Sequence, residues 1–207
     1  MVERLTASGV KQDRIRLIPG FVERRNSQAR LPPPIPRYVF VGRDTVEKGL
    51  RDLVKIWPEG VLLDVYGATA PQARLTGGQG TISFKGSVAR QEILRRLNEY
   101  TALVFPGIAW EGAIPLVVRE AAEAGVPVLA REGTSVADFV TARGFGCSYS
   151  QEGPESLFAA MKNLEQEELS LRNAARRVFL DSMEETRWQS QMRHLFDDLA
   201  VQSPGST

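Results

Sequence analysis

Two basic side chains follow an apolar run near the start of this 207-residue sequence. Residues 38–41 are apolar, Gly42 and Arg43 come directly after them, and Lys48 stands at the expected start of the next helix. An arginine fork and a lysine ammonium are common partners of phosphate groups. The first turn of a helix adds free amides and a partial positive charge. The segment is a candidate diphosphate clamp, and the alternative is a pair of solvated surface charges.

A second segment whose residues could bind a ligand follows the apolar run at residues 102–105. Proline is tolerated in the first turn of a helix, so Pro115 predicts a helix that begins at or near this residue. The amides of Leu116 and Val117 are then among its unpaired donors. Glu120, about one turn further on, can accept hydrogen bonds from vicinal ribose hydroxyls, as an acidic residue does in dinucleotide-binding folds. The simpler alternative is that Glu120 only complements the helix dipole.

Short apolar runs alternate with helical patterns through most of the chain. Such runs are typical of strands buried on both faces of a parallel sheet, and apolar residues between positions 50 and 57 recur with the period of a helix. The alternation predicts a three-layer, doubly wound α/β domain with a parallel sheet, a Rossmann-like fold. Ligands bind such a sheet outside the carboxyl ends of its strands, where both candidate segments lie. The expected strands are residues 38–41, 61–66, 81–84, 102–105, 126–130 and 147–149.

The amino-terminal part of the sequence has a different character. Residues 2–7 have a short helical pattern, residues 14–18 alternate like a strand, and residues 31–36 contain four prolines. A proline-rich stretch forms no sheet ladder or helix interior and acts as a stiff connector. We therefore divide the chain into a hinge remnant with its connector, residues 1–36, and a domain with terminal helices, residues 37–207.

Composition narrows the class of protein. The chain is 43% hydrophobic and 25% charged, which is typical of a soluble globular protein. A net charge of +1 gives no general attraction for nucleic acid. The only cysteine, Cys147, excludes an internal disulfide framework, and with His194 as the only histidine no zinc site is expected. No apolar run has the length of a membrane span, and the charged start is unlike a signal peptide. We expect a cytoplasmic protein without a metal or cofactor, and we interpret the arginines at 95–96 and 176–177 as solvated helix faces.

Taken together, these segments resemble the carboxyl-terminal domain of retaining GT-B-fold glycosyltransferases, the large bacterial group 1 type. Residues 14–22 resemble the hinge strand that ends in Ile-Pro-Asn-Gly-Val, and residues 40–49 resemble the phosphate loop. Residues 82–86 resemble the base-binding turn, and residues 110–127 resemble the signature segment that carries the glutamates. The resemblance covers essentially the whole chain, in order.

The resemblance implies roles for individual residues. Arg43 and Lys48 would bind the donor diphosphate and stabilise the leaving group, and Glu120 would bind the ribose hydroxyls. The turn at Lys85 and Gly86 would meet the base, through backbone groups. The full set implied for the nucleotide and its phosphates is Gly42, Arg43, Lys48, Lys85, Gly86, Leu116, Val117 and Glu120.

The sequence departs from the family pattern at the donor sugar. The family has an earlier glutamate, separated from the second by seven residues, which contacts the transferred sugar; counting back from Glu120, this position is Gly112. Glu111 lies one residue too early and reaches the sugar if the loop absorbs the shift. The implied catalytic residues are then Arg43, Lys48 and Glu111. The implied donor-sugar residues are Glu111, Gly112, Ala113 and Ile114. A milder departure is Gly20, where the family often has asparagine.

The resemblance predicts a domain that binds a nucleotide diphosphate sugar for transfer of a hexose, with retention, to a glycan, lipid or small acceptor. The acceptor domain that precedes the hinge in this family is missing from these 207 residues. We therefore expect donor binding with little or no transfer, and peripheral membrane association only through that missing domain. One alternative is a non-catalytic interaction module of the same fold, which the departure at Gly112 favours. The other is a sugar-nucleotide epimerase, against which the lack of a histidine and carboxylate cluster speaks.

Overall fold

The structure is a computed structural model that describes residues 2–16, 18, 20–25, 31–69, 81–108 and 113–201. Its strands are all parallel and form one sheet in the order β3-β2-β1-β4-β5-β6. The order reverses between β1 and β4, which is the topological switch point of a doubly wound fold. The predicted fold class is therefore confirmed. The strands are β1 (Arg37–Val41), β2 (Leu62–Tyr66), β3 (Ile82–Gly86), β4 (Ala102–Phe105), β5 (Val128–Arg131) and β6 (Gly146–Tyr149).

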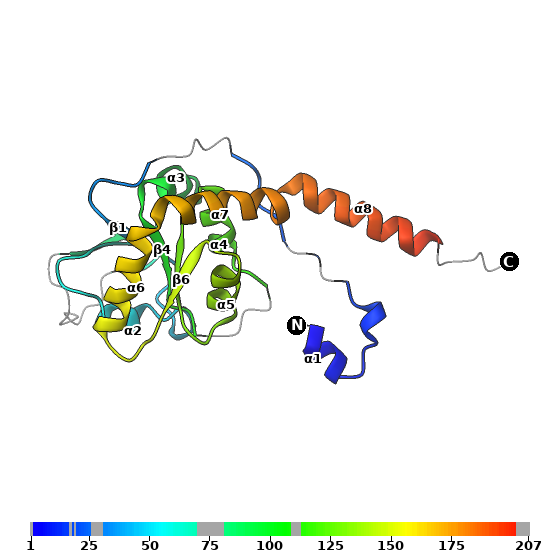
Figure 1. Ribbon diagram of the computed structural model, residues 1–207, viewed down its shortest axis with the longest axis horizontal. Coiled ribbons are helices and arrows are strands. Elements are labelled where there is room, and N and C mark those ends of the chain that lie inside the picture. Colours follow the sequence, from blue (N-terminus) through cyan, green and yellow to red (C-terminus); the bar gives the residue numbers. More distant parts are fainter. Residues whose placement is uncertain are drawn as a thin grey trace.

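Helices cover both faces of this sheet, so the domain has three layers (Figure 1). One face is covered by α3 (Arg90–Arg96), α4 (Leu116–Glu123), α5 (Ser135–Ala142) and α7 (Glu168–Ser182). The other face is covered by α2 (Leu50–Lys55) and α6 (Pro154–Gln166). The remaining helices are α1 (Val2–Ala7) and α8 (Glu185–Val201), with 3-10 turns η1 (Gln12–Arg14), η2 (Val46–Lys48) and η3 (Leu97–Glu99).

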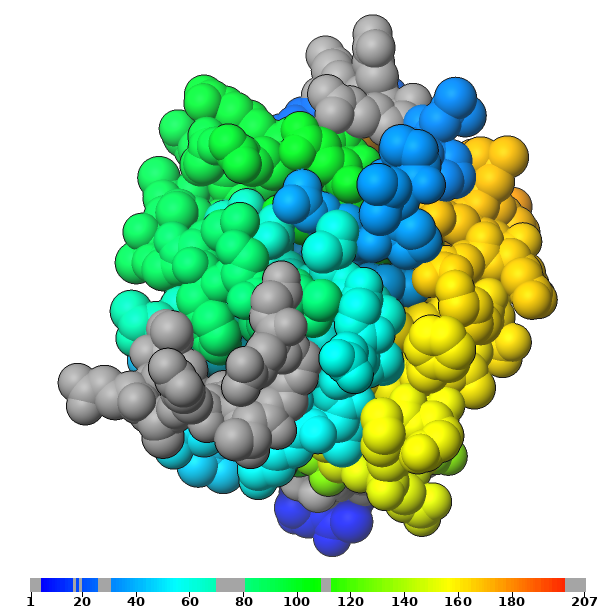
Figure 2. Space-filling model, turned by 90° about the vertical axis from the view of Figure 1, so that its left-hand side faces the viewer, coloured from blue at the N-terminus to red at the C-terminus, as the bar shows by residue number. Residues whose placement is uncertain are grey.

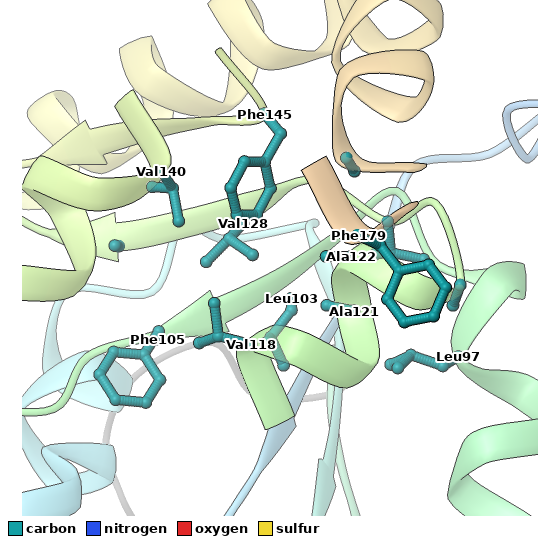
Figure 3. Close-up of a cluster of buried hydrophobic side chains, with 14 of the residues drawn as sticks. Leu97, Leu103, Phe105, Val118, Ala121, Ala122, Val128, Val140, Phe145 and Phe179 are labelled. Atoms are coloured by element: carbon teal, nitrogen blue, oxygen red, sulfur yellow. The ribbon is translucent and has the colours of Figure 1, made fainter. Parts of the chain in front are cut away.

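The larger apolar core holds α4 between the sheet and α7. Ala121 and Ala122 are fully buried, and their small side chains let α4 approach the strands closely. Leu103 and Val128 face this helix from β4 and β5, and Phe179 of α7 lies beside it (Figure 3). A helix packed on two sides is a rigid support for polar groups at its ends.

The second core fixes α2 on the opposite face of the sheet. Leu53 and Trp57 pack with buried residues of β1 and β2, among them Tyr38 and Leu63. The indole Nε1 of Trp57 donates to the carbonyl of Val61 at 2.9 Å. The polar atom of this large side chain is thus satisfied, and the turn that follows α2 is fixed to the residue before β2.

The amino-terminal segment differs from its prediction in one respect. The expected strand at residues 14–18 is wrong, because Arg14 ends η1 and Ile15, Arg16 and Ile18 belong to no strand. A strand needs a neighbour for its ladder of hydrogen bonds, and this segment lies away from both edges of the sheet (Figure 1). Alternation of apolar and polar residues alone cannot supply that partner.

The proline-rich connector is followed directly by β1. β1 begins at Arg37, whose amide donates to the hydroxyl of Thr101 at 3.1 Å. Figure 2 shows residues 31–37, in blue, on the surface between the green region that contains α3 and the yellow and orange helices α6 and α7. Among the described residues, no helix is both long enough and apolar enough to cross a membrane.

Candidate functional site

The loop after β1 presents its basic side chains at the carboxyl edge of the sheet. Gly42 donates its amide to the carbonyl of Tyr66 at 3.0 Å, so this loop starts beside the end of β2. Arg43 is exposed and Lys48 is half-buried. The neighbouring carboxylate of Asp44 is bound by Arg51, with 3.1 Å between Nε and Oδ1. The loop therefore presents positive charge at the edge where ligands bind in this fold.

Lys48 does not open the next helix, and this detail of the prediction is wrong. Lys48 ends η2, and Gly49 separates it from α2 with a left-handed φ of 69°. A left-handed residue breaks the run of helical dihedrals, so the short helix α2 starts at Leu50, two residues after Lys48. The positive charge of this loop comes from side chains more than from a helix terminus.

The loops after β1 and β4 are packed against each other. The amide of Ile108 donates to the carbonyl of Glu47 at 3.0 Å. A Cβ at Gly49 would collide with the carbonyl oxygen of Pro106, so both the φ angle and the contact require glycine here. Because β1 and β4 are the strands of the switch point, this contact joins the two segments that the sequence singled out.

The first turn of α4 has the free donors that Pro115 predicted. Pro115 is the N-cap, and its carbonyl accepts from the amides of Val118 and Arg119 at 3.1 and 3.2 Å. The amides of Leu116 and Val117 therefore have no acceptor within the helix. Pro115 marks the start of α4 as predicted, and these donors lie on the loop side of β4.

Glu120 is buried and held by a partner that the sequence did not indicate. Nε and Nη2 of Arg90 both approach Oε1 of Glu120, at 2.6 and 2.5 Å. The Glu120 side chain is 7% exposed, whereas the Arg90 side chain is 61% exposed. Arg90 opens α3, shortly after the end of β3. The pair thus links the β3–α3 connection to α4 above the sheet.

Lys85 and Gly86 end β3 in different environments. Nζ of Lys85 lies 3.2 Å from Oδ1 of the buried Asp64, which also accepts from the hydroxyl of Tyr100 at 2.8 Å. The Lys85 side chain is therefore engaged on a face of the sheet. The carbonyl of Gly86 accepts from the amide of Gly67 at 2.8 Å, so the backbone at Gly86 lies at the carboxyl edge. The expected contact of this turn with a base through its backbone stays a prediction.

Glu47 is the second carboxylate of the loop after β1, besides Asp44. A hydrogen bond from its own backbone amide, helped by the charges of Arg43 and Lys48, lowers the pKa of Glu47. Glu47 therefore stays ionised at neutral pH. Elsewhere, burial raises the pKa of the Cys147 thiol, so this cysteine has little thiolate and is no candidate nucleophile. Across the described ranges, no three side chains of His, Cys, Asp or Glu come together as metal ligands.

The structure describes only some of the residues expected at the donor sugar. Glu111 and Gly112 lie outside the described residues. Ala113 is exposed, and Ile114 is half-buried with its carbonyl accepting from Nε of Arg119 at 3.1 Å. The catalytic and sugar-binding roles of this loop stay predictions.

Arg119 ties this loop to the hinge segment, which the sequence did not reveal. Its Nη1 donates to the carbonyl of Phe21 at 3.1 Å, while its Nε holds Ile114. A Cβ at Gly20 would collide with this guanidinium. Burial lowers the pKa of Arg119, because desolvation disfavours the charge. Gly20, noted above as a departure from the family pattern, thus leaves room for Arg119.

Comparison with protein families decides the class of the chain. The family described as "Glycosyl transferases group 1" matches residues 35–167. The chain belongs to this family. The matched part runs from the connector through α6 and includes the whole candidate site of this glycosyltransferase domain. A search of curated protein sequences gives no significant match.

Solved structures have the same fold as this glycosyltransferase domain. A glycosyltransferase from Rickettsia africae is 13% identical with a TM-score of 0.75, over 96% of this chain and 61% of that one. The Anabaena protein HepE in complex with UDP-glucose is 15% identical with a TM-score of 0.73, over 95% of this chain and 61% of that one. Sucrose-phosphate synthase from Thermosynechococcus elongatus is 19% identical with a TM-score of 0.71, over 97% and 57%. The chain thus spans about three fifths of the length of these structures.

Proposed function

We propose that this chain is the donor-binding part of a retaining glycosyltransferase and binds a nucleotide diphosphate sugar at the carboxyl edge of its sheet. The contact between the loops after β1 and β4 carries the proposal. It joins the loop that carries Arg43 and Lys48 to the loop that follows β4, at the switch point where this fold binds ligands. The complex of HepE with UDP-glucose supports a nucleotide sugar as the ligand.

The proposed chemistry is stabilisation of a leaving group. When the bond from the sugar to the diphosphate breaks, negative charge develops on the phosphate oxygens. Arg43, Lys48 and the amides of Leu116 and Val117 stabilise that charge without reorganising. Glu120 binds the ribose, and the backbone at Gly86 meets the base. Because these groups supply the positive charge, the proposal needs no metal ion or cofactor.

Transfer itself requires an acceptor, which we propose is bound by a further domain. The similar structures are longer than this chain, which spans only 57% to 61% of them. In a two-domain enzyme the cleft closes over the donor and excludes water, which strengthens every charge contact inside it. We therefore expect the 207 residues to bind donor and to transfer little sugar unaided.

Thermal unfolding with a panel of ligands tests this function. A ligand that binds the native state raises the melting temperature by mass action. UDP, GDP, ADP, dTDP and pyrophosphate are each added at millimolar concentration to the wild-type chain and to an Arg43→Ala/Lys48→Ala double variant. We expect at least one nucleotide to raise the melting temperature of the wild type and to have little effect on the variant. A wild-type melting temperature that none of these ligands moves would leave an interaction module as the better explanation.

A further inference from the structure

We propose that Arg90 is a positioning residue for Glu120 and that the pair makes this site selective for nucleotides that contain ribose instead of 2′-deoxyribose. The inference rests on the proposed function, in which Glu120 meets the ribose. It assigns a role to Arg90, which lies outside both segments that the sequence singled out, and it narrows the class of donor.

The geometry of the pair leaves one side of the carboxylate available. Nε and Nη2 of Arg90 both approach the same oxygen, Oε1 of Glu120, at 2.6 and 2.5 Å. Within the described part of the chain, Oε2 of Glu120 accepts no hydrogen bond. A carboxylate oxygen has two lone pairs and accepts readily from hydroxyl groups. One oxygen is thus held by the protein, while the other can accept from a sugar.

Burial makes this arrangement depend on Arg90. The Glu120 side chain is 7% exposed, and an ionised carboxylate in such surroundings is costly unless it is paired. Within the described residues, Arg90 is the only cation that forms an ion pair with it. Removing Arg90 therefore leaves a buried carboxylate without its charged donor and lets it rotate, which weakens its ability to accept from a hydroxyl.

Arg90 lies between the parts of the fold that we assign to the base and to the ribose of the nucleotide. Arg90 opens α3 and follows Gly86, the end of β3, by four residues. Glu120 lies in α4, after β4. The ion pair therefore bridges the turn assigned to the base and the helix assigned to the ribose. A ligand that joins a base to a ribose would lie along this bridge, where loss of the 2′-hydroxyl removes a partner of Glu120.

Paired titrations test the inference. Calorimetry compares UDP with 2′-deoxy-UDP, ADP with 2′-deoxy-ADP, and GDP with 2′-deoxy-GDP, with pyrophosphate as a probe for the phosphate site alone. The proteins are the wild type, Arg90→Ala, Arg90→Lys, Glu120→Gln and the Arg90→Ala/Glu120→Gln double variant. Arg96→Ala is the matched control, because Arg96 ends the same helix in an exposed pair with Glu92.

We expect the wild type to bind the preferred ribonucleotide about tenfold or more tightly than its 2′-deoxy form, the size of one hydrogen bond to a charged group. Arg90→Ala and Glu120→Gln should each reduce this ratio severalfold, and the double variant should reduce it no further. Arg90→Lys should recover part of the ratio, and Arg96→Ala should keep all of it. Pyrophosphate affinity should be the same in every protein.

Two results would overturn the inference while leaving the proposed function intact. One is a wild type that binds pyrophosphate and nucleotides but treats ribose and deoxyribose alike. The other is an Arg90→Ala variant that keeps the wild-type ratio and only melts at a lower temperature, which would make Arg90 purely structural. A wild type that binds neither nucleotides nor pyrophosphate would overturn the proposed function, and the inference with it.

Discussion

At the scale of single residues, the two cations of the loop after β1 are available to a ligand in different degrees. Arg43 is exposed, whereas Lys48 is half-buried in the turn that ends at Gly49. The carboxylate of Asp44 is bound by Arg51 and does not neutralise the loop. Glu47 stays ionised because its pKa is lowered, so it partly offsets the two cations. A diphosphate would replace solvent around this loop.

Replacing either cation should weaken diphosphate binding without unfolding the domain. We expect Arg43→Ala and Lys48→Ala each to cost about 1.5–3 kcal/mol of binding free energy, the usual size of a charge-assisted hydrogen bond. Calorimetry with pyrophosphate and the tightest nucleoside diphosphate measures the loss. Lys55→Ala is the control, since Lys55 ends α2 in an exposed pair with Asp52. Titration curves that match the wild type for both variants would mean that these are solvated surface charges.

The sequence predicted correctly the position of residues that depends only on their neighbours in the chain. Arg43 follows a buried strand directly, and Pro115 starts a helix, so local rules were enough. Long-range partners were missed, because packing alone brings together residues such as Arg90 and Glu120, which are 30 positions apart. Arg176 was predicted to be solvated, and this is wrong: it is 23% exposed and lies 3.1 Å from Oε1 of the fully buried Glu123.

At the scale of elements, α4 connects the candidate site to the hinge segment. Its first turn offers amides, while Arg119 binds the carbonyls of Ile114 and Phe21. Further along, Glu123 accepts from the amide of Arg25 at 3.0 Å. One helix therefore holds a loop assigned to the donor sugar and a segment that resembles the hinge of the family.

Removing the guanidinium of Arg119 should loosen the hinge segment. We expect Arg119→Met, which keeps much of the apolar volume, to cost about 1–3 kcal/mol of unfolding free energy, because two carbonyls lose a charged donor. Hydrogen exchange should be faster at the amide of Val22, which donates to the carbonyl of Met183 at 2.9 Å. Urea unfolding and exchange on the two proteins make the comparison.

A double-mutant cycle shows whether this effect passes through Gly20. A Cβ at Gly20 would displace the Arg119 guanidinium from the carbonyls of Ile114 and Phe21, so Gly20→Ala should destabilise the wild type. The same substitution should be nearly neutral in the Arg119→Met background, where the guanidinium is gone. Equal costs of Gly20→Ala in both backgrounds would show that Gly20 and Arg119 do not interact.

Most elements could be predicted because buried strands are short apolar runs with clear ends. The expected strand at residues 102–105 is confirmed to the residue, and the other five strands of the sheet differ by one or two positions at one or both ends. The expected strand at 14–18 is wrong because a local pattern cannot tell whether a neighbouring strand exists. The helix expected at Lys48 starts later because a left-handed glycine follows that residue.

At the scale of the whole molecule, different features lie at the two ends of the parallel strands. The candidate site occupies the carboxyl edge, and a buried ion pair of α7 supports the amino edge. Arg172 binds Oε1 of Glu168, and also the carbonyls of Tyr100 and Gly125 at 2.5 and 3.3 Å. These carbonyls precede β4 and β5, so α7 holds the starts of two central strands.

Breaking the Arg172–Glu168 ion pair should lower the stability of the domain without changing its affinity for a nucleotide. We expect Arg172→Met to lower the free energy of unfolding by about 3–5 kcal/mol, because it leaves a buried carboxylate and two carbonyls without their donor. Burial raises the pKa of Glu168, against the opposing effect of Arg172, so without Arg172 the carboxyl is still more easily protonated. A folded-state pKa above the unfolded value of about 4.3 favours folding at low pH and loses that contribution as pH rises through it.

The loss of unfolding free energy in Arg172→Met relative to the wild type should therefore become smaller when the pH falls from 7 to about 5. In the Arg172→Met background, Glu168→Gln should remove this dependence on pH. Urea unfolding of the wild type, Arg172→Met and the Arg172→Met/Glu168→Gln double variant at both pH values measures the effect, with Arg172→Lys as a milder variant in case Arg172→Met does not fold. Nucleotide affinity of every folded variant should match the wild type, because the pair lies at the opposite edge of the sheet. A small deficit that does not vary with pH would show that the pair is solvated in solution. A change in nucleotide affinity would show that the two edges are coupled.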